Sequence, residues 1–158
     1  MSKAKDLLNE LLVNVFNYIT NIENVALKQM GVKLSVNEVH ILEAIVNTSY
    51  PSMSNVANKL LITPGTLTTA TDKLVNKGYL RRYQEENDRR RVFLKLTDKG
   101  YEVIKIHNIF HDEMIEHIIQ DMEIIDDGEL LVMLDKLVKY FRDKYDKRLN
   151  DLRGTKEV

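Results

Sequence analysis

Residues 62–99 have the sequence ITPGTLTTATDKLVNKGYLRRYQEENDRRRVFLKLTDK, which predicts a helix followed by a basic hairpin. Thr63 can cap this helix, and Pro64 can occupy its first position, where the N–H that proline lacks would have no partner in the helix. Gly78 supplies the left-handed residue that commonly ends a helix. The helix should therefore begin at Pro64 and stop just before Gly78.

The expected helix has one apolar face and one small, polar face. Leu67, Ala70, Thr71 and Leu74 recur at the 3.6-residue spacing of a buried stripe. A shallow face of hydroxyl groups fits the major groove of DNA, where side chains read base edges. The side chains that we expect to enter the groove are those on or beside this face: Thr63, Thr66, Thr68, Thr69 and Lys73.

Two short runs rich in β-branched, aromatic and apolar residues, at 80–83 and 92–96, predict the strands of the hairpin. Between them lies the polar sequence EENDRRR, which we expect to form a tip that carries three arginines. A basic tip beside a groove-binding helix reaches phosphate oxygens or the adjacent minor groove. The arginines that we expect to contact DNA are Arg82, Arg89, Arg90 and Arg91.

A shorter apolar-periodic segment comes before this helix. Residues 52–61 predict a helix capped by Ser52 or Ser54, and residues 62–65 predict the turn that follows it. Residues 54–77 would then form a helix-turn-helix, whose first helix lies across the phosphate backbone. Ser54 therefore joins the candidate DNA contacts.

Long amphipathic helices are expected at both ends of the chain. Residues 3–30 carry a wide apolar stripe, Thr97 caps a helix to about residue 120, and a last helix spans 129–147 after a short connection. Residues 148–158 lose the apolar periodicity and should fray. The first helix has more apolar surface than one neighbouring helix can cover, which predicts a homodimer.

Composition favours a single soluble domain. The chain of 158 residues is 44% apolar and 30% charged. It lacks both a run of about 18 apolar residues and a signal-peptide pattern, so we expect a cytoplasmic protein. The absence of cysteine excludes disulfides, thiolate zinc sites and thiol nucleophiles. No GxSxG elbow, glycine-rich phosphate loop or HExxH motif occurs, and we expect no enzyme activity.

The distribution of charge matters more than the net charge of −1. Residues 1–76 hold 6 basic and 6 acidic side chains, residues 77–99 hold 8 and 4, and residues 100–158 hold 9 and 14. The local balances are therefore 0, +4 and −5. Positive charge is concentrated in the hairpin, as DNA binding requires.

The hairpin resembles a known family signature. The sequence DRR at 88–90 followed by LKLTDKG at 94–100 resembles the DxR…LxLTxxG wing signature of the MarR family of winged helix-turn-helix regulators. Three further stretches resemble the FabT-like branch of that family, which regulates bacterial fatty-acid synthesis. They are NEVHILEAI at 37–45, TPGTLTTATDKLVNKGYL at 63–80 and HNIFHDEMIEHII at 107–119.

The resemblance implies a mainly α fold with a small β-hairpin wing. Residues 1–158 would form one MarR-type domain, with a winged helix-turn-helix lobe at 35–99 and dimerisation helices at 3–30 and 101–147. The implied function is sequence-specific transcriptional repression at a pseudo-palindromic operator, with Asp88 positioning Arg90. By resemblance to the FabT-like branch, the regulated genes would serve fatty-acid synthesis. The corepressor would be a long-chain acyl group on acyl carrier protein, bound where the scaffold meets the lobes.

The histidines leave a metal site open as an alternative. His107 and His111 are spaced i, i+4 on one helix, and Glu38 and His40 on another helix could approach them to bind zinc, as in a zinc-responsive regulator. Apolar residues beside these histidines favour ordinary packing instead, so we expect neither a metal nor another cofactor. A winged-helix module that binds protein, or a non-specific DNA coater, remains a rival to the repressor.

Overall fold

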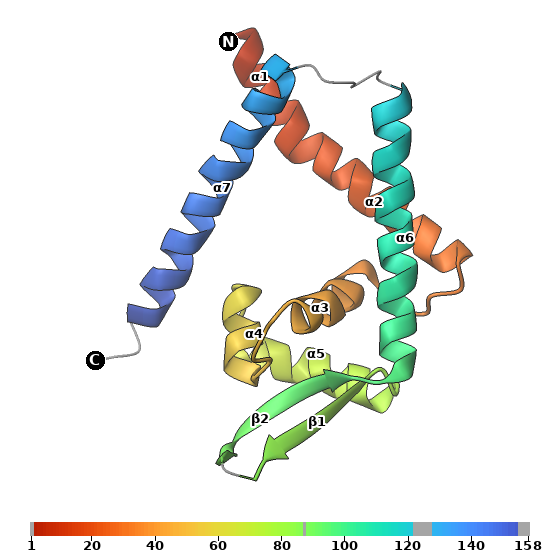
Figure 1. Cartoon of the computed structure of the whole chain (residues 1–158), viewed down its shortest axis with the longest axis vertical. Coiled ribbons are helices and arrows are strands. Elements are labelled where there is room, and N and C mark those ends of the chain that lie inside the picture. The colour runs from red at the N-terminus through yellow and green to blue at the C-terminus, as the bar shows by residue number, and fades with distance from the viewer. Residues whose placement is uncertain (1, 87, 122–127, 155–158) are drawn as a thin grey trace.

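The computed structural model describes residues 2–86, 88–121 and 128–154, which form a small lobe attached to long helices (Figure 1). Helices α3, α4 and α5 and the hairpin form the lobe, while α2 and α6 cross above it and α7 stands apart. In chain order the elements are α1 (Lys3–Asn9), the π-helical segment η1 (Glu10–Val15), α2 (Phe16–Gln29), α3 (Val36–Val46), α4 (Met53–Lys59), α5 (Pro64–Asn76), β1 (Leu80–Glu85), β2 (Asp88–Leu96), α6 (Asp98–Asp121) and α7 (Gly128–Gly154).

The core of the lobe contains the apolar residues expected from helical periodicity. Leu67, Thr71 and Leu74 of α5 are buried, and Ala70 is half-buried, so the predicted stripe is confirmed. Leu67 and Leu74 belong to one cluster that includes Leu42 of α3 and residues of α2, α4, the wing and α6. Burial of this apolar face fixes which side of α5 points outward.

Side-chain caps start three helices of the lobe. Ser35 and Glu38 form a reciprocal capping box at α3, and Ser52 caps α4 by accepting from the N–H of Asn55. Thr63 caps α5, as predicted, with Pro64 at its start. Of the two serines expected at α4, only Ser52 is the cap.

The turn of the helix-turn-helix lies slightly earlier than predicted. Pro64 and Gly65 already belong to α5, and the left-handed residue of the turn is Leu61, with φ 54°. The N–H of Ile62 donates to the carbonyl of Ala57 at 3.1 Å and closes the end of α4. Leucine rarely adopts this left-handed conformation, which glycine adopts easily, so nothing in the sequence indicated that the turn lies at Leu61.

The wing is a two-stranded antiparallel sheet. Its register pairs Leu80 with Leu96 and Tyr83 with Phe93, and the pairing continues past an irregularity to Glu85 and Asp88. The arginines at 89–91 therefore lie in β2, and the prediction that they form the tip is wrong. Backbone hydrogen bonding extends an antiparallel ladder whatever the side chains are, so polar residues did not end the strands.

Buried aromatic packing anchors the wing to the lobe. Phe93 is 1% exposed and stacks on Tyr83, with ring centroids 5.5 Å apart. Tyr50, from the loop before α4, packs edge-on against the same ring at 5.0 Å. Tyr83 and Phe93 therefore serve as packing contacts of the sheet.

Close packing at Gly100 explains the end of the wing signature. The hydroxyl of Thr97 donates to the carbonyl of Gly78 at 2.7 Å and accepts the N–H of Gly100, as expected of a helix cap. A side chain at Gly100 would collide with the backbone carbonyl of Tyr79. Gly78 itself has φ 79°, so the predicted left-handed helix end is confirmed.

The last helix is longer than expected. Helix α7 continues to Gly154, so the prediction that residues 148–154 fray is wrong; the preceding connection at 122–127 lies outside the described residues. No proline or glycine interrupts the sequence between Gly128 and Gly154, and a helix that has started propagates at little cost. Within the described part of the chain, no helix is long and apolar enough to span a membrane.

Candidate nucleic-acid interface

The outward face of α5 carries the side chains that the sequence assigned to the major groove. Thr66, Thr68, Thr69 and Lys73 are exposed, while Leu67 between them points into the core. Thr63 precedes them as the cap, and its Oγ1 accepts the N–H of Thr66 at 3.1 Å. Thr63 lies at the start of α5 and Lys73 in its last turn, so the five candidates are accessible along the length of the helix.

The threonine hydroxyls are already hydrogen-bonded within the helix. Oγ1 of Thr68 donates to the carbonyl of Pro64 at 2.8 Å, and Oγ1 of Thr69 donates to that of Gly65 at 3.2 Å. These bonds use the hydroxyl protons, so the oxygen lone pairs and the methyl groups remain for an external partner. Such a face suits the amino groups of adenine or cytosine and the methyl group of thymine.

A groove of about 650 Å³ runs between α5 and the start of α3. Thr66, Thr69, Lys73 and Lys77 form one wall, and Ser35 and Asn37 lie on the other. The groove extends the polar face of α5 sideways with hydroxyl, amide and ammonium groups, which are typical donors to phosphate.

Glu38 lies in this groove and not in a histidine site. Its carboxylate accepts the N–H of Ser35 at 2.9 Å and Nζ of Lys77 at 2.6 Å. Burial raises the pKa of Glu38, but the hydrogen bonds from Lys77 and Ser35 outweigh burial and hold that pKa below its usual range. Glu38 is an ionised link between α3 and α5. The alternative in which Glu38 lies beside the histidines as a metal ligand is therefore wrong.

The wing arginines adjoin the helix-turn-helix on the same surface. Arg89, Arg90 and Arg91 are exposed. Arg90 and Arg91 line a cleft of about 420 Å³ together with residues 52–55 at the start of α4. This cleft includes the exposed Ser54, so candidates predicted from two separate motifs are neighbours. The side chain of Asp88, expected to position Arg90, lies outside the described residues.

Arg82 occupies a different position from the other arginines. Its guanidinium donates to the carboxylate of Asp72 at 2.5 Å and to Oγ1 of Thr71 at 2.7 Å, both on α5. A guanidinium held in this way braces the wing against the recognition helix instead of extending as a free phosphate contact. Asp72 was not among the predicted site residues, because only the folded structure brings it beside Arg82.

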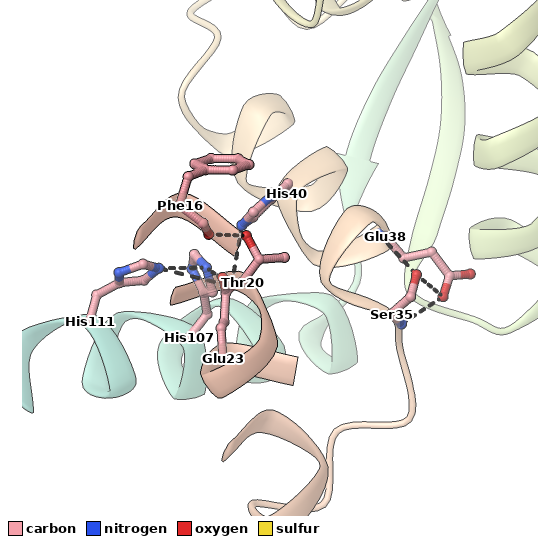
Figure 2. Close-up of polar contacts among 8 residues, drawn as sticks. All are labelled: Phe16, Thr20, Glu23, Ser35, Glu38, His40, His107 and His111. Atoms are coloured by element: carbon pink, nitrogen blue, oxygen red, sulfur yellow. Dashed lines mark hydrogen bonds and ion pairs between the residues drawn. The ribbon is translucent and has the colours of Figure 1, made fainter. Parts of the chain in front are cut away.

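A second polar cluster lies between the long helices, away from the α5 face (Figure 2). Oε1 of Glu23 on α2 lies 2.9 Å from Nε2 of His107 and 3.2 Å from Nε2 of His40. Nε2 of His111 lies 3.1 Å from Nε2 of His107. Burial, followed by the neighbouring His111, lowers the pKa of His107 below its usual value and favours its neutral form.

Three of these side chains were expected from the sequence to lie together, but the fourth was not. His40, His107 and His111 do meet, yet their carboxylate neighbour is Glu23 and not Glu38. Glu23 is 2% exposed and lies four residues before the buried Leu27. An acidic residue on the apolar stripe of the first helix was the signal that could have identified it.

The lobe defines the chain as a winged helix-turn-helix protein, because three short helices and a β-hairpin surround one core and leave α5 exposed. Residues 34–92 match the model of the MarR family. The crystal structure of Streptococcus pneumoniae FabT in complex with DNA is similar at a TM-score of 0.77 and 33% identity, over 90% of this chain and 98% of that chain. The chain belongs to the MarR family.

Curated relatives match shorter stretches. PecS, an HTH-type transcriptional regulator of Dickeya dadantii (strain 3937), is 41% identical over 75 residues, which are 46% of this chain and 45% of PecS. YhjH, an uncharacterized HTH-type transcriptional regulator of Bacillus subtilis (strain 168), is 22% identical over 63% of this chain and 57% of YhjH. The chain therefore spans about half the length of these two relatives.

Proposed function

We propose that this protein is a homodimeric, sequence-specific transcriptional repressor that binds DNA through two winged helix-turn-helix lobes. The observation that carries the proposal is the exposed threonine face of α5 in a lobe whose wing arginines Arg90 and Arg91 line a cleft with Ser54 at the start of α4. Threonines and Lys73 would read bases in the major groove, and the arginines would contact phosphates or the minor groove. The structure of the related FabT was determined in complex with DNA, which supports this assignment.

The dimer is proposed from uncovered apolar surface on the long helices. Leu134, Val138, Phe141 and Tyr145 follow one stripe of α7 and are all exposed in the single chain. In Figure 1, α7 lies apart from α2 and α6, and it contacts α4 of the same chain. A second copy of the chain would cover this stripe, in line with the dimers typical of the family.

The genes that we propose to be regulated are those of fatty-acid synthesis, with an acyl group on acyl carrier protein as corepressor. Similarity to FabT over nearly the whole chain supports this branch of the family. A groove of about 410 Å³ between α2 and α6 is lined by Ile22, Phe110, Met114 and Ile118, among other residues. Its apolar side chains match the chemistry of an acyl chain.

The proposal is tested by measuring the affinity of the protein for selected and for random DNA at increasing salt concentrations. A specific repressor should bind a selected pseudo-palindrome about 10³-fold or more tighter than random DNA at physiological salt. A non-specific coater would bind both alike, with the same steep salt dependence, and a protein-interaction module would bind neither. Either of these last two results would overturn the assignment.

Replacement of Arg90 by alanine should weaken binding to every operator variant. An exposed wing arginine that contacts the sugar-phosphate backbone contributes about 1–3 kcal/mol whatever the base sequence. Fluorescence anisotropy with labelled operator DNA would measure the loss, and thermal unfolding should show an unchanged melting temperature. Lys136→Ala, which removes an exposed cation from α7, is the matched control and should bind normally. A lower melting temperature with unaltered DNA affinity would contradict the prediction.

Replacement of Thr69 by alanine should change base preference instead. The substitution removes the hydroxyl and methyl groups of Thr69. The variant protein should therefore discriminate less, by about 1–3 kcal/mol, between the operator and operators changed at the base that Thr69 contacts. A panel of single-base operator variants measures this, with Arg90→Ala as the comparison that shifts all variants together. Identical profiles for the two substitutions would remove the groove assignment of Thr69.

A further inference from the structure

Hydrogen bonding alone does not account for the cluster around Glu23. Nε2 of His107 lies 2.9 Å from Oε1 of Glu23 and 3.1 Å from Nε2 of His111. If this nitrogen carries a proton and donates it to Glu23, it cannot accept a hydrogen bond from His111. If it accepts from His111, its lone pair faces the carboxylate instead. One of the two short contacts is therefore left without a linear hydrogen bond in either tautomer.

The other ring nitrogen of His107 has no hydrogen-bond partner among the described residues. Its side chain is 1% exposed, and its Nδ1 is buried without a hydrogen-bond partner within the described structure. Buried polar atoms are nearly always paired, so this histidine does not fit the expectation of ordinary, satisfied packing. A carboxylate 2% exposed beside it likewise needs a compensating positive charge.

The three donor atoms have the spacing of a tetrahedral metal site. Zinc bonds of about 2.0–2.1 Å place neighbouring ligand atoms about 3.3 Å apart. Oε1 of Glu23, Nε2 of His107 and Nε2 of His111 form a triangle with sides of 2.9, 3.1 and 3.9 Å. Two imidazoles and one carboxylate are a donor set that suits zinc and disfavours magnesium or calcium.

We propose that Glu23, His107 and His111 bind a divalent transition-metal ion of the zinc class. The ion would bond to all three donor atoms, so that no proton is needed between them. Its positive charge would balance the negative charge of the buried carboxylate. One coordination position would remain for water or another ligand.

His40 would position the carboxylate ligand and would not itself bind the ion. Its Nε2 lies 3.2 Å from the same Oε1 of Glu23, so it orients the carboxylate from α3. Glu43 is close enough to act similarly, because donor atoms of His40, Glu43 and His107 lie within 4.8 Å of one another. The site would join α2 and α6 to the DNA-binding lobe through α3, and this inference does not depend on the proposed function.

Zinc binding to the full-length protein tests the proposal directly. The protein is first stripped of metal with a chelator, and zinc chloride is then titrated against a competing chromogenic chelator. Wild-type protein should bind one zinc ion per protomer and gain thermal stability, whereas magnesium chloride should have no effect. Cobalt(II) should produce the intense visible absorption of a tetrahedral site.

Four variants locate the site. His111→Ala and Glu23→Gln each remove a ligand and should lower zinc affinity by more than about 100-fold, while His40→Ala should lower it by about 10–100-fold. His111 is partly exposed, with 34% of its side chain accessible, so its removal should leave the fold intact. His117→Ala, which removes an exposed histidine of the same helix, is the matched control and should bind zinc like the wild type.

Two results would overturn the proposal. One is a wild type that binds zinc no more tightly than His111→Ala, and the other is an equal loss in His117→Ala. Full zinc affinity in His40→Ala would overturn the part assigned to His40.

Discussion

Insertion of about 5 base pairs between the two half-sites of the operator should abolish tight binding. If a two-fold scaffold relates the two lobes, their α5 helices enter successive major grooves on one side of the duplex, about 10 base pairs apart. Half a helical turn moves one half-site to the far side, where a rigid dimer cannot reach it. Affinity should then fall towards that of a single lobe, by about 100-fold or more.

Gel-shift titrations with the two operators measure this loss. A control operator of the original length, with about 5 central base pairs replaced by other bases, separates spacing from sequence and should bind tightly. Hydroxyl-radical footprints on the original operator should show two protected half-sites on one face of the duplex. If affinity survived the insertion, a rigid dimer of lobes would have to be abandoned.

The same geometry implies a steep dependence on salt. Residues 77–99 carry a local charge of +4, whereas residues 100–158 carry −5. Two hairpins on one duplex would release counterions from several phosphates, and log affinity would fall by about 0.9 per phosphate for each decade of salt. The net charge of the whole chain is near zero, but the local positive charge of residues 77–99 favours DNA binding.

Features that depend on local sequence were predicted correctly. The Thr63 cap and the left-handed Gly78 are formed by neighbours in the chain, and the structure has both. Helical periodicity likewise identified the buried face of α5, because the spacing of the apolar residues within an amphipathic helix shows which side is buried.

Features that depend on residues distant in the sequence were not predicted. The bonding of Arg82 to Asp72, and the meeting of Glu23 with three histidines from two other helices, arise only when separate elements pack together. Element boundaries failed for a related reason. The strands of the wing and helix α7 extend through polar residues because the backbone supplies the hydrogen bonds.

Replacement of Leu134 by aspartate should dissociate the proposed dimer. Leu134 lies on the apolar stripe of α7 that also contains Val138 and Phe141, and it is 44% exposed in the single chain. A carboxylate buried at the centre of an apolar interface, without a partner, costs several kcal/mol. Because that side chain is already accessible in the protomer, the fold itself should survive. Loss of the second lobe should lower operator affinity by about 100-fold or more.

Sedimentation equilibrium would measure the mass, and gel shift on the intact operator would measure the affinity. Lys136→Asp is the matched control, because Lys136 lies on the opposite side of α7 and receives the same carboxylate. The control should remain a dimer and bind DNA, which shows that negative charge on α7 does not by itself repel the duplex. A Leu134→Asp protein that stayed dimeric would exclude this stripe from the interface. A monomer that kept full operator affinity would show instead that the two lobes bind independently, and the scaffold would then have no part in setting their spacing.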